Sequence, residues 1–322
     1  MNRSLMPRCL ILAAEHSPMT SVIGPLEILT LAQRLTGRRD WQFEVVADAA
    51  LATQGGLTLQ GTRPFCDSDS PDILIIAALG DPRRNPTPLS TASLQRIRQL
   101  AEQGCHLVSI CSGAWALAES GLLNGLNATS HWSLSDWLAE HFPAVHWHTD
   151  AMLIRNNSIW CGGGGSAWQD VTLSLVQHYF GDAIARHTAQ LVLIDRDRDD
   201  QRRYRGFIPA RQHQDHLIHQ VQDWLDRHAC EPFVVADLAA QVHLSERQFK
   251  RRFSAAVKLP PREYVQSLRM EQAKHLLTTS QQQVDSIARQ CGYDDVRFFR
   301  RLFRRSSGLT PLAYRAKVSS AG

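Results

Sequence analysis

The sequence lacks the features that mark membrane proteins, disulfide-rich secreted proteins and zinc proteins. Its 322 residues contain no apolar run of transmembrane length and no convincing signal peptide. The seven cysteines are an odd number and are scattered, without a CxxC pair or a zinc-type spacing. These absences argue against a membrane protein, a metal site and a disulfide framework, and they favour a reducing cytoplasm as the location of the chain.

Lysine is scarce, and residues 1–210 contain none. The four lysines all lie in the remaining part of the chain, at Lys250, Lys258, Lys274 and Lys317. Residues 1–210 carry 17 Lys and Arg against 20 Asp and Glu, a net charge of −3, whereas residues 211–322 carry 18 against 11, a net charge of +7. The basic charge therefore belongs to the C-terminal part, as expected of a module held to phosphates by charge.

A basic amphipathic helix is the strongest pattern in this C-terminal part. Four apolar residues recur at three- and four-residue spacing and form one helix face: Val296, Phe299, Leu302 and Phe303. The positions between and after them hold five arginines and no acid. A helix from Val284 to Cys291 precedes it and ends at Gly292, a residue suited to a left-handed turn. Together they predict a helix-turn-helix, whose second helix enters the DNA major groove.

The same pattern occurs a second time, fifty residues earlier. Six positions agree in residue type: Phe249, Arg251, Phe253, Leu259, Pro261 and Tyr264 correspond to Phe299, Arg301, Phe303, Leu309, Pro311 and Tyr314. Ser245 and Gln248 predict a capping box at the start of the earlier helix. Lys258 stands where the later copy has Gly308, so we expect that turn to be strained or differently shaped. The repeat favours two helix-turn-helix units over two merely solvated helices.

These residues resemble the C-terminal signature of the AraC/XylS family of transcription regulators. The signature is present as Ile287-Ala288, Gly292-Tyr293, Asp295, Phe299, Arg301, Phe303, Gly308, Thr310-Pro311 and Tyr314-Arg315. The resemblance implies an all-α domain in which one long helix, with Pro261 in its first turn, joins two units that read successive major-groove segments of double-stranded DNA. The side chains expected to read the DNA are Arg247, Lys250, Arg251, Arg297, Arg300 and Arg301.

The first part of the chain alternates between apolar strands and helices. Strands are expected at Cys9–Ala14, Phe43–Ala47, Asp72–Leu79, His106–Ile110, Val145–His148 and Ala151–Trp160, the last interrupted by the turn-prone pair Asn156-Asn157. Helices are expected at Ser21–Leu35, Ser90–Gln103, Ser133–His141, Ala167–Phe180 and Asp182–Ile194. This rhythm predicts an α/β domain with a flavodoxin-like parallel sheet sandwiched by helices. Residues 196–211 are strongly charged and are interpreted as a linker, so the predicted domains are residues 1–195 and 212–322.

Cys111 follows the strand His106–Ile110 and opens a short helix, an arrangement typical of a nucleophile elbow. Such a position lifts the thiol above the carboxyl edge of the sheet, where helix N–H groups lower its pKa. A buried cysteine at the end of a strand is the alternative, and the pattern by itself does not decide between the two.

The surrounding segments are similar to the PfpI-type, class I glutamine amidotransferase-like domain that precedes AraC modules in GlxA-like regulators. The matching pieces are Gly24–Glu27, Cys111–Ala114, Gly121–Leu123, Ala128–Trp132 and Gly164–Asp170. Catalytic members of that superfamily often have a histidine base after the cysteine, where this chain has Ser112. His131 is the alternative base, and Glu15 resembles the acidic residue that approaches the thiol in that superfamily. We nevertheless expect an inherited ligand pocket rather than an assembled triad, lined by Glu15, Cys111, Trp115, His131 and Trp132.

Two functions from different classes follow from these patterns. The first is a ligand-responsive transcription regulator, for which the implied partners are DNA, a small-molecule effector, a second copy of the chain and RNA polymerase. Aromatic rings beside a carboxylate suit a cation such as an amine or amino-acid derivative, although tryptophans more often pack a core. The second is a cysteine hydrolase or amidotransferase-like enzyme using Cys111, which the missing histidine disfavours.

We expect no enzyme activity, no cofactor and no metal. Three histidines spaced three apart are interpreted as a solvated polar face, because no carboxylate or thiol completes a metal site: His213, His216 and His219.

Overall fold

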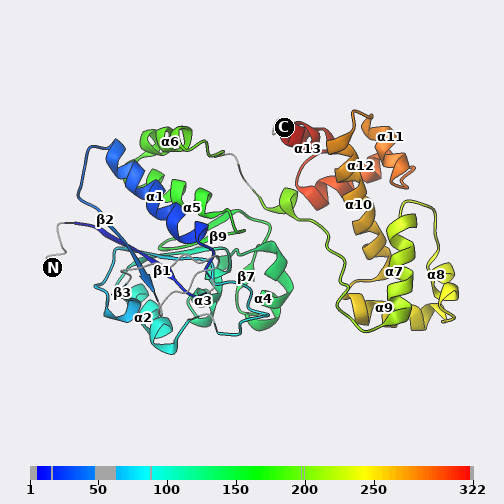
Figure 1. Ribbon diagram of the computed structural model, residues 1–322, viewed down its shortest axis with the longest axis horizontal. Helices are drawn as coiled ribbons and strands as arrows, with labels where there is room; N and C mark the ends of the chain where they lie inside the picture. The colour runs from blue at the N-terminus through cyan, green and yellow to red at the C-terminus, as the bar shows by residue number, and fades with distance from the viewer. Residues whose placement is uncertain are drawn as a thin grey trace. The chain divides into compact units, whose positions relative to one another are not determined.

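The computed structural model describes residues 6–15, 17–47, 63–87, 89–196, 198 and 200–319. The chain divides into two compact units, Met1–Gln201 and Arg202–Gly322 (Figure 1). Among the described residues, none of the helices combines the length and the apolar character needed to cross a bilayer.

The N-terminal unit is built on a sheet whose described strands lie in the order β3-β2-β1-β4-β5-β9-β8. The strands are β1 (Arg8–Ala13), β2 (Gln42–Ala47), β3 (Arg63–Pro64), β4 (Ile73–Ile76), β5 (His106–Ile110), β8 (Leu153–Asn156) and β9 (Ile159–Gly162). Neighbouring strands pair in parallel, except that β8 runs antiparallel to β9. The central order β2-β1-β4-β5-β9 is that of flavodoxin-like sheets, which confirms the predicted fold class.

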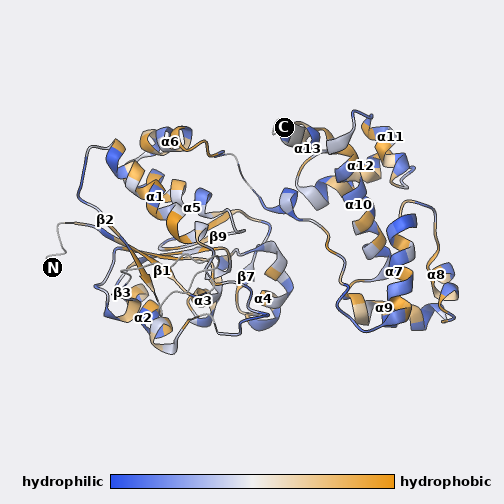
Figure 2. Ribbon diagram, in the orientation of Figure 1, coloured by the Kyte–Doolittle hydropathy of each residue, from blue (hydrophilic) through white to orange (hydrophobic). Residues whose placement is uncertain are grey.

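Helices cover both faces of this sheet, which explains why β1 is apolar throughout. Its odd-numbered residues from Cys9 to Ala13 belong to the core under α1 (Thr20–Leu35), α5 (Trp168–Phe180) and α6 (Asp182–Leu191). Its even-numbered residues, Leu10 and Leu12, belong to the core formed with α2 (Thr91–Glu102) and α3 (Ala114–Glu119). Figure 1 shows the two helical layers on opposite sides of the sheet, and Figure 2 shows the hydrophobic residues gathered on the strands between them. A strand buried on both faces needs no alternation of polar and apolar residues.

Two predicted strands differ from the structure. Over Asp72–Leu79 the ladder covers only β4, because beyond it the N–H groups of Ala78 and Leu79 donate to the side chains of Ser21 and Ser112. The segment Val145–His148 contributes β7 (His146–Trp147), which pairs with β6 (Asn127–Ala128) in a separate small sheet beside α4 (Ser135–His141).

The C-terminal unit is helical throughout its described elements. These are a short 3-10 turn, η5 (Arg202–Tyr204), and the helices α7 (His216–His228), α8 (Val235–Gln241), α9 (Glu246–Val257), α10 (Pro261–Thr279), α11 (Val284–Gln290), α12 (Val296–Ser307) and α13 (Pro311–Ser319). One hydrophobic cluster joins α7, α8 and α9 to the first part of α10, and a second joins α11, α12 and α13 to its second part. The long helix α10 begins at Pro261, as predicted, and the two clusters are the two helix-turn-helix units.

The fifty-residue repeat has an equivalent set of contacts in each copy. Phe249 and Phe299 are both fully buried, and so are their partners one helical turn later. The capping box of Ser245 is present at the start of α9. Lys258 adopts the left-handed conformation of Gly308, with φ of +63° against +77°. The turn therefore keeps its shape in both copies, and the left-handed backbone of Lys258 is strained because its Cβ approaches a carbonyl oxygen.

The charged segment 196–211, interpreted as a linker, is anchored along much of its length. Arg198 forms an ion pair with Asp170 in the N-terminal unit, and both side chains are about nine-tenths buried. Beyond residue 201, Lys274 donates from Nζ to the carbonyl oxygen of Arg205 at 2.7 Å. The first part of the segment therefore belongs to the N-terminal unit and the second part to the C-terminal unit.

Candidate DNA interface and effector site

Helix α12 has a buried apolar face and an exposed basic face. Phe299, Leu302 and Phe303 are at most 6% exposed, while all five arginines of the helix are exposed. Asp295 caps the start of the helix, accepting hydrogen bonds from the N–H groups of Arg297 at 2.8 Å and Phe298 at 2.9 Å. The three predicted DNA-reading residues here, Arg297, Arg300 and Arg301, share the exposed face.

Helix α9 repeats this arrangement, with its three predicted DNA-reading residues, Arg247, Lys250 and Arg251, all exposed. Two of the six basic residues have an acidic partner within the unit. Lys250 pairs with Glu246, and Arg300 donates to Asp285 on α11 at 2.7 Å. Exposed ion pairs in water are weak, so phosphate or base oxygens can replace these carboxylates.

The turn after β5 is a tight elbow at Cys111, which has φ of +55°. Ser112 accepts a hydrogen bond on Oγ from the N–H of Leu79 at 2.9 Å, which connects the elbow to the segment that follows β4. A Cβ at Gly113 would lie 2.6 Å from the carbonyl oxygen of Ile76, so only glycine fits there. A residue other than glycine with positive φ is uncommon, and such strain often marks a site that binds or reacts.

The Cys111 thiol is not activated. Burial raises its pKa to about 11, and this outweighs the opposing hydrogen bonds from Ser112. The lowered pKa expected for an elbow cysteine is therefore wrong for this structure. Within the described part of the chain, the thiol makes no hydrogen bond to His131 or Glu15, so no triad is assembled around it.

The loop that carries His131 and Trp132 lies against the elbow. Ser130 donates from Oγ to the carbonyl oxygen of Cys111 at 2.8 Å. The rings of His131 and Trp132 are partly exposed, with their centroids 5.4 Å apart. Burial and, to a smaller extent, the nearby positive charge of Arg83 lower the pKa of His131. The structure thus brings three predicted site residues, Cys111, His131 and Trp132, to one edge of the sheet.

Gln201, the last residue of the N-terminal unit, is inserted beneath this loop and is 2% exposed. Its Nε2 donates to the carbonyl oxygens of Ser130 at 2.8 Å and Thr149 at 2.9 Å, and its Oε1 accepts from the N–H of Trp132 at 3.3 Å. A Cβ at Gly163 would lie 2.2 Å from Gln201 Nε2, which explains one glycine of the Gly162–Gly165 run.

Two predicted site residues have different surroundings. Trp115 is 2% exposed and packs edge-on against Trp137 in the core, with ring centroids 5.6 Å apart. It is therefore a packing residue, and we remove it from the candidate ligand-binding set. Glu15 is exposed just after β1, at the same carboxyl edge as the elbow. The two residues differ in burial: Trp115 is buried and Glu15 is exposed. The sequence could not predict the burial of Trp115, because its helix is too short to show a periodic pattern.

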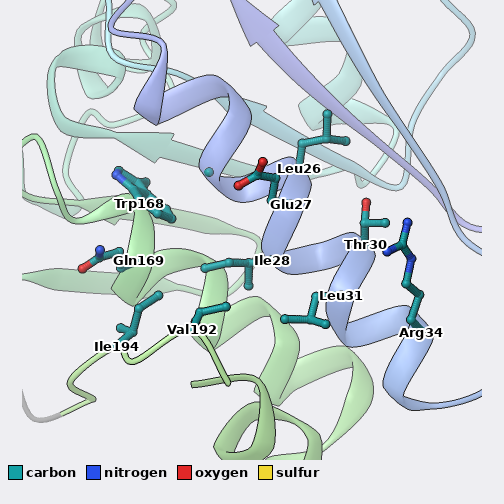
Figure 3. A pocket seen from close by; sticks show the side chains of 11 residues that line it. Leu26, Glu27, Ile28, Thr30, Leu31, Arg34, Trp168, Gln169, Val192 and Ile194 are labelled. Atoms are coloured by element: carbon teal, nitrogen blue, oxygen red, sulfur yellow. The ribbon is translucent and has the colours of Figure 1, made fainter. Parts of the chain in front are cut away.

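A separate groove lies between α1 on one side and the start of α5 with the segment after α6 on the other (Figure 3). Its volume is about 580 Å³, with Glu27 and Arg34 on α1, and Trp168 at the start of α5. The ring of Trp168 lies so close to Gly24 that a Cβ there would be 2.6 Å away, which accounts for glycine in the Gly24-Pro25 pair. None of the predicted ligand-binding residues lines this groove.

Two further residues of these sites were not predicted. Gln201 gives no local signal, since its partners lie 50 to 72 residues away in the sequence. Phe298 remains 44% exposed on α12, with the guanidinium of Arg301 5.9 Å from its ring. The repeat could have predicted that Phe298 is exposed, because the equivalent position of the earlier copy is the polar residue Gln248.

The fold and these surfaces define a protein in which an α/β domain with a cysteine elbow precedes a double helix-turn-helix domain. The model of the DJ-1/PfpI family matches residues 8–159, and a model described as a helix-turn-helix domain matches residues 238–317. The chain belongs to the DJ-1/PfpI family through its N-terminal unit, and its C-terminal unit is a helix-turn-helix domain of the AraC type. Both resemblances drawn from the sequence are confirmed.

Similar proteins include regulators that match nearly the whole chain and an enzyme that matches its N-terminal half. The HTH-type transcriptional regulator GbdR of Pseudomonas aeruginosa is 25% identical over 309 residues, which cover 93% of this chain and 82% of the relative. GlxA of Rhizobium meliloti is 24% identical over 96% of this chain and 95% of its own length. An isonitrile hydratase of Pseudomonas putida is 30% identical over 52% of this chain and 68% of the enzyme. Among solved structures, a putative transcriptional regulator from Vibrio parahaemolyticus has a TM-score of 0.55 and 27% identity, over 58% of this chain and 99% of that one.

Proposed function

We propose that this protein is a ligand-responsive transcription regulator that binds double-stranded DNA through α9 and α12. The observation that carries the proposal is the pair of exposed basic helix faces, each backed by the same pair of buried phenylalanines. The relatives that match nearly the whole chain are HTH-type transcriptional regulators. Such a protein acts beside the chromosome, so we place it in the cytoplasm.

The DNA-reading residues are tested on duplexes that the purified protein selects from a random-sequence library. Arg251→Ala and Arg297→Ala should each weaken binding by about 1–3 kcal/mol and relax specificity at one position of the site. Arg227→Ala, which removes an exposed arginine from α7, is the matched control and should bind as the wild type does. Undiminished binding by both α9 and α12 variants would overturn the assignment of these helices.

The effector site is proposed at the carboxyl edge of the sheet, where Cys111, His131 and Trp132 gather and Glu15 is exposed. A carboxylate and an aromatic ring favour a small molecule that carries an amine. Thermal shift across amines, amino acids and carboxylic acids identifies the class, since a ligand that binds the native state raises its stability. Cys111→Ala and Glu15→Gln should reduce the shift without weakening DNA binding. Stabilisation by carboxylic acids alone would contradict the proposed charge.

Gln201 is proposed to transmit the occupancy of this site to the DNA-binding unit. Its side chain is bonded beneath the loop of His131 and Trp132, and the next residue begins η5, which packs against the recognition helix α12. A ligand that moves the loop therefore pulls on the residue directly before η5. Gln201→Ala should retain DNA binding and lose its dependence on effector, whereas Gln190→Ala, an exposed glutamine of α6, should keep both. An unchanged effector response in Gln201→Ala would exclude this route.

We propose that the elbow binds without catalysing a reaction. The raised pKa of Cys111 and the use of Ser112 in fixing the elbow support binding rather than turnover. The enzyme interpretation retains one favourable observation, the similarity to an isonitrile hydratase. If the wild type converts an amide or an isonitrile, and Cys111→Ala abolishes this while regulation is untouched, the enzyme interpretation is correct.

The regulator is proposed to act as a dimer through its N-terminal unit and to contact RNA polymerase at the promoter. AraC-type resemblance supports both, and an apolar patch on α6 and its exit supplies a contact surface: Leu191 is 54% exposed, Val192 36% and Leu193 91%. Leu193→Glu should convert a dimer to a monomer in sedimentation. A wild-type protein that sediments as a monomer at micromolar concentration would contradict the dimer.

A further inference from the structure

Two cysteines lie together where the two helix-turn-helix units join. Cys230 belongs to the loop between α7 and α8, and Cys291 is the C-cap residue that follows α11. The two backbones touch, since a Cβ built at Gly292 would lie 2.4 Å from the carbonyl oxygen of Cys230. Cys230 packs against the hydrophobic cluster that contains the fully buried Cys291. The fold thus brings together two cysteines that are 61 positions apart in the sequence.

The two thiols differ in access and in acidity. Cys291 is fully buried, whereas Cys230 is partly exposed. The neighbouring thiol of Cys291, helped by the positive charge of Arg269 and opposed by burial, lowers the pKa of Cys230. The same pairing, together with burial, raises the pKa of Cys291. A partly exposed thiol of lowered pKa beside a buried thiol supplies the attacking and the resolving cysteine of a disulfide-forming pair.

We propose that Cys230 and Cys291 form a peroxide-sensitive dithiol that closes to a disulfide across the junction of the two helix-turn-helix units. The Cys230 thiolate attacks one oxygen of hydrogen peroxide, so that an S–O bond forms, the O–O bond breaks and hydroxide leaves as water after protonation. Cys291 then attacks the Cys230 sulfur, forming the S–S bond and releasing a second water that takes the Cys291 proton. Two thiols are oxidised and one peroxide is reduced to two waters.

Formation of the disulfide changes the junction that fixes the position of α12 relative to α9. Arg269 on α10 holds this junction by donating to the carbonyl oxygens of Ala229 at 2.6 Å, Glu231 at 2.9 Å and Gly292 at 2.9 Å. A disulfide draws the sulfurs to about 2.05 Å and removes the thiolate beside Arg269. The turn before α12 must follow, so α12 moves relative to α9. This consequence rests on the proposed DNA-binding function, and the expected effect is about tenfold weaker DNA binding, the size of one lost base contact.

The chemical step is tested on the full chain treated with hydrogen peroxide, alkylated and digested without reduction. Mass spectrometry should find the Cys230 and Cys291 peptides joined, and dithiothreitol should separate them. Cys66→Ser, which removes an exposed thiol elsewhere, should still form the link, while Cys230→Ser and Cys291→Ser should not. Over-oxidation of Cys230 without a link, or a link between other cysteines, would overturn the proposal.

The regulatory step is tested by DNA affinity, with duplexes selected by the reduced protein. Peroxide should weaken binding by the wild type and by Cys66→Ser about tenfold, and leave Cys230→Ser at its reduced affinity. Cys230 is partly exposed, so its serine variant is expected to fold, as circular dichroism can verify. Equal affinity of the reduced and disulfide-linked wild type would overturn the regulatory consequence. If the reduced protein binds no duplex, the proposed DNA-binding function fails, and the mapping of the disulfide still tests the dithiol.

Discussion

Lys258 and Gly308 end equivalent helices in the same left-handed conformation. This conformation costs an L-residue about 1–2 kcal/mol that glycine avoids, although glycine loses more backbone entropy on folding. We therefore expect Lys258→Gly to raise the free energy of unfolding of the C-terminal unit by about 1 kcal/mol. The reverse change, Gly308→Ala, should lower it. Denaturant unfolding measures both, and equal stability of Lys258→Gly and the wild type would show that the turn relaxes around lysine.

His106 is a buried base at the start of β5, 7% exposed, with Nδ1 bonded to the Tyr179 hydroxyl at 2.8 Å. Its Nε2 has no hydrogen-bond partner among the described residues. Burial, and to a smaller extent the neighbouring His178, lower its pKa from 6.5 to about 4. Between pH 6.5 and 4 the unfolded state therefore binds a proton at His106 that the folded state does not bind. The free energy of unfolding has its full value above pH 6.5 and decreases as the pH falls towards 4.

This shift predicts that the free energy of unfolding of the N-terminal unit falls by about 2 kcal/mol between pH 7.5 and pH 5. His106→Gln, though less stable at neutral pH, should lose much less over the same interval, since it has no proton to take up. Thermal unfolding across this pH range measures the difference. Parallel pH profiles for the two proteins would assign the acid sensitivity to other groups.

At the scale of elements, Arg269 joins the two helix-turn-helix units from the middle of α10. Its guanidinium donates to three backbone carbonyls, two before α8 and one in the turn before α12, and lies 5.4 Å from the ring of Tyr293. We expect Arg269→Ala to lower the free energy of unfolding of the C-terminal unit by about 3 kcal/mol, because hydrogen bonds to a charged group are strong and the carbonyls lose their donor. Denaturant unfolding provides the measurement.

Two variants sharpen this prediction. Arg269→Lys keeps the charge but cannot reach three carbonyls with a planar fork, so it should restore less than half of the loss. Arg262→Ala removes an exposed arginine from the same helix and should be nearly neutral. If Arg269→Lys is as stable as the wild type, Arg269 stabilises the unit through its charge alone and not through the geometry of its three hydrogen bonds.

At the scale of the whole molecule, the separation of charge predicts how salt acts on DNA binding. Only the C-terminal part is basic, and the exposed Arg304 and Arg305 near the end of α12 are suited to phosphate contacts. Replacing both with Gln should reduce the slope of log affinity against log salt by up to about 2, with no change in sequence preference. Arg39→Gln, an exposed arginine of the N-terminal unit, should leave the slope unchanged. An equal loss of slope in both variants would show that the DNA contacts extend beyond the helix-turn-helix units.

The elements of both units could be predicted because the signals for them are local. The continuous apolar residues of β1, the capping box at Ser245 and Pro261 at the start of α10 each act over a few residues, and each has the predicted place in the structure. The repeat also allowed the exposed faces of α9 and α12 to be predicted. A helix that buries two phenylalanines four residues apart on one face exposes the residues on its opposite face. The sequence by itself therefore determined the fold class and the exposure of the basic faces on α9 and α12.

Only the tertiary structure decided which residues of the effector site are accessible and how acidic the thiols are. Trp115 is taken into the core, Gln201 reaches partners 50 to 72 residues away, and burial makes Cys111 a weak acid. Cys230 is the more acidic thiol because its neighbour is Cys291, on a different helix-turn-helix unit. Burial and electrostatics sum over all atoms that surround a group, and those atoms come from distant parts of the chain that no local pattern places together.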